Sequence, residues 1–221
     1  MNRIQSTLQS DTALRCANMP KPIRIELPVQ LLVEGNDQRN FFEAFIEHLS
    51  LENIQVQDFG GVSELRGFLR ALVNAPDFRS TVQSVGIVRD AETSATGAFQ
   101  SVRSSLENAG LPVPDSPEKR TGTSPTVTAL ILPDKSRQGM LETLLCESFA
   151  ATPVDQCIDG FFKCVEQLPD VSLSRPDKAR ARVYLTTKPE PHLSVGVAAK
   201  KGYWDLRHNV FSRVRNFLRM I

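Results

Sequence analysis

The chain has 221 residues, enough for one domain or for one domain with an appendage. Its 41% apolar and 23% charged residues are ordinary for a globular protein, and its net charge of +1 excludes a polycation, so binding of nucleic acid would need a local basic patch. Its apolar runs fall short of the about 18 residues of a membrane span, so we expect no membrane segment and a cytoplasmic location.

The N-terminal region is polar and lacks the continuous apolar core of a secretory signal. We expect residues 1–22 to be a disordered or extended segment. Residues 23–221 are expected to form a single α/β domain with a helical extension at the C-terminus. Three cysteines, Cys146, Cys157 and Cys164, occur in apolar helical contexts without a CxxC pair, which predicts small buried hydrophobic residues in a reducing cytoplasm.

Four short apolar segments alternate with helical patterns along the chain. The first contains Pro28, so regular strand pairing is expected only after that residue. The third is nearly all apolar at its end, as a strand buried on both faces should be. Strands are predicted at residues 23–33, 54–59, 82–88 and 127–132.

Helices are predicted where apolar side chains recur at helical spacing. The helix after the second strand is expected to start at Ser63 as its N-cap and to bury Val62, and Gly110 is expected to close the helix before the fourth strand. The segments 112–125 and 188–202 are predicted to be loops. The predicted helices span residues 37–49, 63–75, 96–109, 140–149, 154–168, 177–187 and 204–221.

This alternation predicts an α/β fold with a parallel sheet and right-handed crossovers. If the first strand lies between the second and the third, the strand order is 2-1-3-4 and the topological switch point falls between strands one and three. Glu34 ends strand one and Asp90 ends strand three, so two acidic segments 56 positions apart in the sequence would become neighbours.

The two acidic segments are Glu34-Gly35-Asn36-Asp37 and Asp90-Ala91-Glu92. Carboxylates that crowd together repel one another unless a hard cation with oxygen ligands relieves them. The pattern therefore predicts a site for Mg²⁺ or Mn²⁺. Alternatives stay open. Glu34 and Asp90 could accept hydrogen bonds from free N–H groups at helix starts. Asp37 either caps the first helix or forms a hydrogen bond that orients a metal ligand without binding the metal itself.

A strand followed by Glu-Gly-x-x-Asp, and then a strand ending in Asp-x-Asp, resembles the TOPRIM domains of topoisomerases, bacterial primases and OLD-type (overcoming lysogenisation defect) nucleases. Over residues 23–219 the chain is most similar to uncharacterised bacterial TOPRIM-like proteins related to the OLD-type nucleases. These share a Pro-Asp pair, a Gly-x-Leu-Glu stretch and a Lys-Gly-x-Trp segment, matched here at 133–134, 139–142 and 201–204.

The resemblance implies a three-layer sandwich with a mostly parallel sheet in the order 2-1-3-4 and additional C-terminal helices. It also implies that Glu34 is a general acid/base or a metal ligand and that Asp90 is the principal ligand of Mg²⁺. The chain departs from the family at Glu92, where an Asp is usual. Glutamate is one methylene longer, so metal binding is retained as an expectation whereas catalysis stays open.

Further residues follow from the likeness to OLD-type nucleases. Glu142 is either a ligand of a second metal or a solvated helix acid, and Lys178 either stabilises charge on a phosphoryl group or is a surface lysine. The C-terminal helix carries arginines that either contact phosphates or form a solvated face, namely Arg213, Arg215 and Arg219.

Two main functions follow from these residues. The first is a metal-dependent nuclease acting on DNA or RNA. The second is a non-catalytic metal- or nucleotide-binding module that works through a partner protein, since the sequence contains no GxxxxGK[ST] and so lacks the ATPase motif that accompanies OLD-type nucleases. A third is a phosphatase-like or phosphotransfer enzyme. The oligomeric state stays open.

Overall fold

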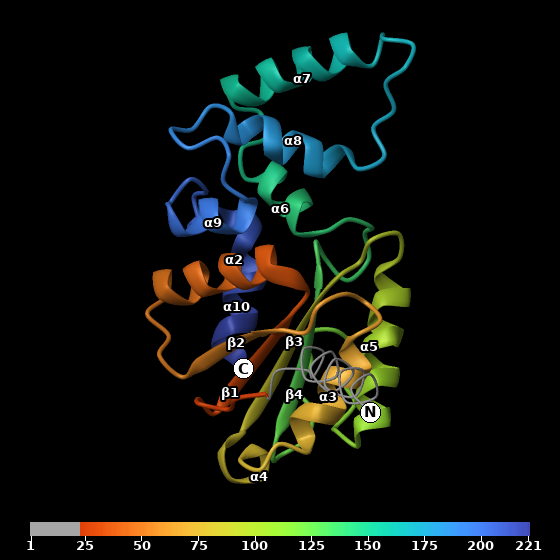
Figure 1. Cartoon of the computed structure of the whole chain (residues 1–221), viewed down its shortest axis with the longest axis vertical. Helices are drawn as coiled ribbons and strands as arrows, with labels where there is room; N and C mark the ends of the chain where they lie inside the picture. Colours follow the sequence, from red (N-terminus) through yellow and green to blue (C-terminus); the bar gives the residue numbers. More distant parts are fainter. Residues whose placement is uncertain (1–22) are drawn as a thin grey trace, which may run out of the picture.

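A computed structural model describes residues 23–221, so the prediction for residues 1–22 lies outside the described residues. At its centre is a four-stranded, all-parallel sheet in the order β2-β1-β3-β4 (Figure 1), which confirms the predicted order. The strands are β1 (Val29–Val33), β2 (Ile54–Asp58), β3 (Ser84–Asp90) and β4 (Thr126–Leu132).

The two central strands are buried on both faces, as their apolar runs predict. Pairing of β1 begins at Val29, directly after Pro28, because proline has no N–H for the ladder. Gly86 in β3 allows the C-terminal helix to approach: a Cβ at this position would lie 3.1 Å from Phe217 Cζ and 3.0 Å from Ile221 Cδ1. The sheet and the end of the chain are therefore packed in direct contact.

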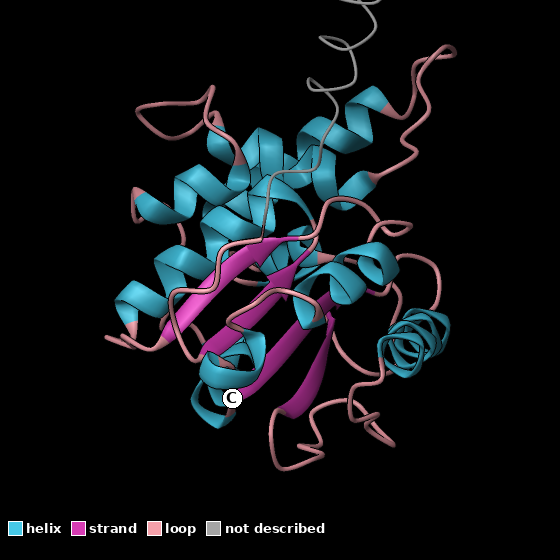
Figure 2. Cartoon of the chain, turned by 60° about the horizontal axis from the view of Figure 1, so that its bottom comes forward, coloured by secondary structure: helices cyan, strands magenta, loops and turns pink. Residues whose placement is uncertain are grey.

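One face of the sheet is covered by α2 (Gly35–His48) and α10 (Ser212–Met220), and α9 (Val195–Lys200) packs on α2. The side chains of α2 and α10 share a core with Leu31, Val33, Val88, Leu130 and Leu132 of the strands. The opposite face is covered by α3 (Leu65–Val73), the short α4 (Phe78–Thr81) and α5 (Ala95–Ala109), which pack on Leu32, Val85, Ile87, Ala129 and Ile131. Figure 2 shows helices on both sides of the strands, so the expected three layers are present.

Three further helices extend beyond the carboxyl ends of the strands. These are α6 (Leu141–Glu147), α7 (Pro153–Val165) and α8 (Pro176–Leu185), with α7 at the end of the molecule opposite α4 (Figure 1). The Tyr184 ring stacks on Phe149 at 4.2 Å and on Trp204 at 4.9 Å between ring centroids. This stack joins α8 to the chain that leads into α10, so the outer helices are attached to the sheet layer.

Two predictions near the C-terminus are wrong. Residues 188–202 contain α9, which is only 6 residues long and therefore too short to show a helical period. The last α-helix begins at Ser212 and not at 204, after a 3-10 turn at Asn209–Phe211. Before it, Asp205 Oδ1 accepts a hydrogen bond from the Arg207 N–H at 3.1 Å and His208 Nδ1 accepts one from the Val210 N–H at 3.3 Å, and such local bonds compete with helix formation.

Other corrections concern single side chains. Val62 is 49% exposed and α3 begins only at Leu65, so neither the burial of Val62 nor the cap at Ser63 is confirmed. Cys157 and Cys164 are exposed, and only Cys146 is half-buried, so the prediction of three buried cysteines is wrong for two of them. Within residues 23–221 no helix combines the length and the apolar character needed to span a membrane.

Candidate functional site

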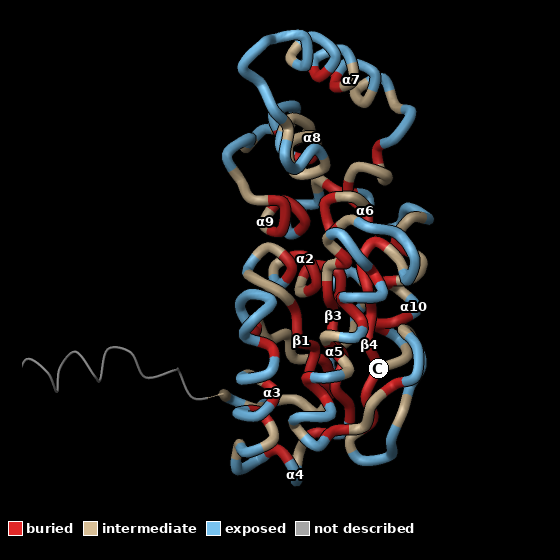
Figure 3. The backbone as a smooth tube through the Cα atoms, turned by 90° about the vertical axis from the view of Figure 1, so that its right-hand side faces the viewer, coloured by how far each residue is buried: buried red, intermediate tan, exposed pale blue. Residues whose placement is uncertain are grey.

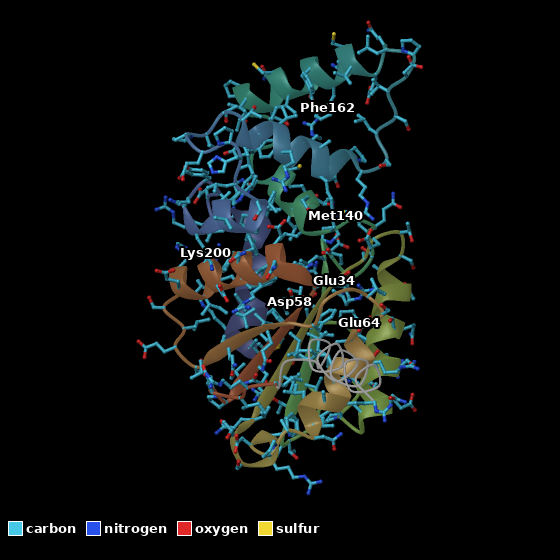
Figure 4. All side chains as sticks on the ribbon, viewed as in Figure 1. Glu34, Asp58, Glu64, Met140, Phe162 and Lys200 are labelled. Atoms are coloured by element: carbon cyan, nitrogen blue, oxygen red, sulfur yellow. The ribbon has the colours of Figure 1, made fainter. Side chains whose placement is uncertain are left out.

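The candidate site lies where β1 and β3 end, beneath α6. Asp90 is the last residue of β3 and not a loop residue, and its Oδ1 accepts a hydrogen bond from the Leu141 N–H at the start of α6, at 3.0 Å. Figure 4 shows Glu34 and Asp58 at the ends of neighbouring strands and Met140 above them. The switch point of the sheet therefore does bring the first and second acidic segments to one edge.

Asp90 is surrounded by other carboxylates. Burial, together with the negative charges of Glu142, Glu34 and Glu92, raises the pKa of Asp90 to about 8, against the hydrogen bond from Leu141 that lowers it. A group that is desolvated and faces like charges binds its proton more tightly. Four predicted acidic residues therefore do act on one another in the folded chain.

Glu34 is not turned toward Asp90. Its carboxylate forms an ion pair with the Arg89 guanidinium, and both side chains are largely buried, with 17% and 6% of their areas exposed. The parallel register explains the pairing: Leu32 lies beside Ile87, so two residues further on Glu34 comes level with Arg89. Arg89 was given no role on sequence grounds, although a charged residue inside an apolar strand needs a partner.

Side-chain alternation separates Arg89 from Asp90. Ile87 belongs to the core under α3 and α5, whereas Val88 belongs to the core under α2 and α10. Because successive side chains on a strand point to opposite faces, Arg89 follows Ile87 and Asp90 follows Val88. The Glu34–Arg89 pair and Asp90 thus approach the edge of the sheet from its two faces.

The loop after β3 is fixed to the loop before α6. Glu92 has φ of 49° and pairs with Gly139 in a short antiparallel bridge, with N–O distances of 2.8 and 2.9 Å. Gly139 has φ of 131°, and a Cβ there would meet Thr143 Oγ1 at 2.6 Å, so glycine is required. The bridge holds the Glu92 segment next to the helix that carries Glu142.

Glu142 and Lys178, which the resemblance singled out on separate grounds, lie together. Lys178 Nζ is 3.6 Å from Glu142 Oε1, and 43% of the lysine side chain is exposed, against 11% for the glutamate. The first turn of α8 is held there because Thr143 Oγ1 donates to Asp177 Oδ2 at 2.5 Å. A solvated helix acid at position 142 is excluded, since Glu142 is buried.

Asp37 does not cap α2. Its Oδ1 accepts a hydrogen bond from the Gly196 N–H at 3.3 Å, and a Cβ on Gly196 would lie 2.2 Å from the Asp37 carbonyl oxygen. Asp37 therefore anchors α9 against α2. The start of α2 is instead held by Gln38, whose Oε1 accepts the Glu34 N–H at 3.0 Å.

Sequence reasoning missed two further polar residues at this edge. Asp58, at the end of β2, accepts the N–H groups of Gly35 and Gly60, each at 2.7 Å, and so fixes the turns after β1 and β2. The Gly60-Gly61 pair after a strand was the available signal. Within residues 23–221, Gln38 Nε2 and Arg89 Nε are buried donors without a hydrogen-bond partner. Both residues contact Glu34: Gln38 accepts the Glu34 N–H, and Arg89 donates to the Glu34 carboxylate.

The predicted basic face of α10 is divided. Arg213 donates to the Pro133 carbonyl oxygen at 2.7 Å and pairs with Glu118, and Arg215 donates to the Leu206 carbonyl oxygen at 3.1 Å. Arg219 is exposed. Two of the three arginines thus hold neighbouring loops, which weakens the expectation that all three contact phosphates.

The comparisons with known proteins give one match. A family described as "Protein of unknown function (DUF3226)" matches residues 28–221. The chain belongs to this family. No curated protein and no solved structure matches the chain. The matched range contains every candidate residue at the edge of the sheet, so the site lies within the part of the chain that defines the family.

The residues at the edge suit a divalent cation by chemistry. Glu34, Asp90, Glu92 and Glu142 supply carboxylate oxygens, the ligands that Mg²⁺ prefers. Against them stand two cations, one on Arg89 and one on Lys178, so ionisation of all four acids leaves two negative charges in excess. In the described part of the chain, however, no three His, Cys, Asp or Glu side chains already converge on one point. Glu34 and Glu142 are turned toward their cationic partners instead.

Proposed function

We propose that the chain is a TOPRIM-like hydrolase that uses Mg²⁺ or Mn²⁺ to cleave phosphodiester bonds in nucleic acid, in the cytoplasm. The observation that supports this most is the crowding around Asp90, whose pKa is raised to about 8 at the switch point of a parallel sheet. Strongly perturbed acids at the carboxyl edge of such sheets are typical of functional sites.

The metal would be held by Asp90 and Glu92 on one segment, by Glu142 on α6 and by Glu34 on β1. When bound it would polarise a phosphodiester and activate water. Glu34 would have to turn from Arg89 to take part, and the freed guanidinium would then be available to a phosphate oxygen, for which its planar donors are suited.

The chain's own groups have separate tasks in this proposal. The Leu141 N–H fixes Asp90 Oδ1, which leaves the second carboxylate oxygen, Oδ2, to bind the metal. Glu34, beside the Arg89 guanidinium, accepts or returns a proton. Lys178 stays next to Glu142 yet is exposed enough to stabilise charge on a phosphoryl oxygen.

A second function is favoured by one observation. Glu34 and Glu142 are already neutralised by Arg89 and Lys178, and Glu92 replaces the usual Asp. These features fit a non-catalytic module that binds a metal or a nucleotide and acts through a partner protein. A nucleotide would bring its own phosphates to Arg89 and Lys178.

A cleavage assay distinguishes the two functions. The protein is incubated with single- and double-stranded DNA and RNA in about 10 mM Mg²⁺ or Mn²⁺, beside Asp90→Asn and an Asp115→Asn control. Asp115 is a matched control because it is an exposed aspartate that pairs only with exposed Lys119. Cleavage that is lost in Asp90→Asn and kept in Asp115→Asn supports the hydrolase. Absence of cleavage on all four substrates contradicts it.

Thermal melts with and without the same metals test binding separately. For a dissociation constant of about 1 mM, about 10 mM metal stabilises the folded state by roughly 1.4 kcal/mol. In a domain of this size that raises Tm by about 3–6 °C. Asp90→Asn should lose most of the shift. A full shift without cleavage favours the non-catalytic module, and a full shift that persists in Asp90→Asn removes Asp90 from the site.

A further inference from the structure

Helix α7 has two apolar faces. On the inner face, Ile158 and Phe162 are only 3% and 7% exposed and belong to the main core. On the outer face, Phe161 is 49% exposed, and Leu168 just beyond the helix is 53% exposed. Figure 3 shows α7 at the periphery, mostly exposed, with its few buried positions on one side. A helix that is apolar on both sides is typical of a helix packed between two layers, and residues 23–221 supply only one of them.

The outer side chains follow a helix-pairing pattern. Val154, Cys157, Phe161 and Cys164 succeed one another at intervals of 3, 4 and 3 residues, and Leu168 comes 4 residues later. Intervals of 3 and 4 keep the side chains in one seam along a helix, which is the spacing by which two helices pack against each other. The pattern therefore indicates that the missing layer is another helix.

A groove lies beside this seam, between α7 and α8. It has a volume of about 370 Å³ and is lined by Val154, Cys157 and Phe161 of α7, with Val183 and Thr186 of α8 among its other walls. No charged residue lines it. A projecting aromatic side chain, Phe161, and an apolar hollow thus lie on the same surface.

We propose that α7 is the contact helix of a symmetric dimer of this chain, in which Phe161 of each copy enters the α7–α8 groove of the other. In a two-fold interface the same patch occurs on both copies and must fit itself. A surface that carries both the projection and the hollow meets this condition. The proposal does not depend on the proposed hydrolase, because no candidate site residue lies on α7.

Charge explains why a second copy fits this face. The charged residues of α7 lie off the seam: Asp155 and Asp159 pair with Arg180 of α8, and the exposed Lys163 stands one residue before Cys164. The positions beside the seam include Gly160 and Gln167, which are exposed and uncharged. Two copies can therefore meet along the seam without like charges in direct contact.

The dimer is expected to be reversible. The 13 residues of α7 make a helix about 20 Å long, so the contact is at or below the small end of stable interfaces, about 1,200 Å². We therefore expect a dissociation constant on the order of 10 µM. The aromatic anchor should carry most of the binding, because a few buried aromatic residues dominate such contacts.

Sedimentation equilibrium over about 1–500 µM protein, in EDTA and without nucleic acid, tests the dimer apart from the proposed function. The wild type should pass from monomer to dimer, and Phe161→Asp should raise the dissociation constant about 30-fold or more. Gln156→Asp is the matched control, since it adds the same charge at an exposed position of α7 outside the seam. It should dimerise like the wild type, and circular dichroism melts check that both variants fold.

Thiol cross-linking tests the location independently. In a Cys16→Ser background, a short bis-maleimide should join two copies through Cys157 and Cys164, which are exposed, whereas burial raises the pKa of Cys146 to about 12 and slows its reaction. Cross-linking should be lost in Cys157→Ser/Cys164→Ser. A protein that stays monomeric at all concentrations, or a dimer that is unaffected by Phe161→Asp, overturns the proposal.

Discussion

The carboxyl edge of the sheet and the outer face of α7 break the usual distribution of side chains in opposite ways. At the edge, the ion pair of Glu34 and Arg89 is largely buried. On α7, Phe161 is about half exposed. Burying charge costs desolvation and exposing apolar surface gives up the hydrophobic effect, so neither arrangement is explained by the stability of the isolated chain.

The difference between the two regions lies in what each would bind. The edge has more carboxylates than cations, so binding of a cation, or of a ligand that carries a cation, would reduce the repulsion between the carboxylates. The α7 face carries no charge along its seam, so packing against an apolar surface would remove its exposed apolar side chains from water. One molecule therefore offers a polar site and an apolar site at separate places, and substitutions should affect them independently.

The largest expected effect is that of Arg89→Met. Removal of the guanidinium leaves the Glu34 carboxylate largely buried and unpaired. Breaking a buried pair from one side costs about 3–5 kcal/mol. Urea unfolding at pH 7 measures the loss.

Two comparisons make the Arg89 result specific. Glu34→Gln combined with Arg89→Met should recover much of the stability, because no charge then stays unpaired. Arg137→Met removes an arginine that is itself 53% exposed, against 6% for Arg89, and should cost less than about 1 kcal/mol. Equal losses in Arg89→Met and Arg137→Met would contradict the distinct role of the buried pair.

The next effect concerns two adjacent residues of α7. Phe162→Ala should cost about 3 kcal/mol because Phe162 fills the core between α7 and α8, whereas Phe161→Ala should cost less than about 1 kcal/mol. Both are measured by urea unfolding at about 1 µM, a concentration below the dissociation constant expected for the proposed dimer. Similar losses would mean that the outer face is as well packed as the inner face, and the contrast on which the dimer rests would fail.

Much of the fold could be predicted from the sequence because it depends on local patterns. Continuous apolar runs and helical stripes predicted the four strands, their alternation with helices favoured the parallel order 2-1-3-4, and Gly110 closes α5 in the left-handed conformation as expected. The predictions that failed concern segments that are short or that form hydrogen bonds with nearby backbone groups. The helix α9 has too few residues to show a period, and the segment 204–211 bends because Asp205 and His208 bond to nearby backbone groups.

The site was predicted at the level of elements but not of side chains. The switch-point rule placed Glu34 near Asp90, and the structure confirms that β1 and β3, which carry them at their ends, are neighbours. It was the register that decided their contacts: Glu34 comes level with Arg89, one residue before Asp90. Register depends on the packing of whole strands, which no single motif specifies. The meeting of Lys178 with Glu142 depends likewise on how α8 docks on α6.

The smallest effect, and the most direct reading of the edge, is the pH dependence of Asp90→Asn. The native state holds the Asp90 proton up to about pH 8, whereas an unfolded Asp releases it near pH 3.8. Between these values the unfolded state binds fewer protons, so this group lowers the stability of the wild type as the pH rises from about 4 to about 8. Asn has no such titration, and its oxygen can still accept the Leu141 N–H. Because the Asn amide needs a partner of its own at every pH, which costs about 1–3 kcal/mol, we expect Asp90→Asn to be less stable than the wild type at pH 4 and to gain on it as the pH rises, so that the net difference at pH 9 favours the variant. Urea unfolding of both proteins at pH 4, 6 and 9 in EDTA measures it. Parallel stability curves would show that the acids at this edge do not repel one another. The edge would then not differ from the uncharged face of α7 in its electrostatics.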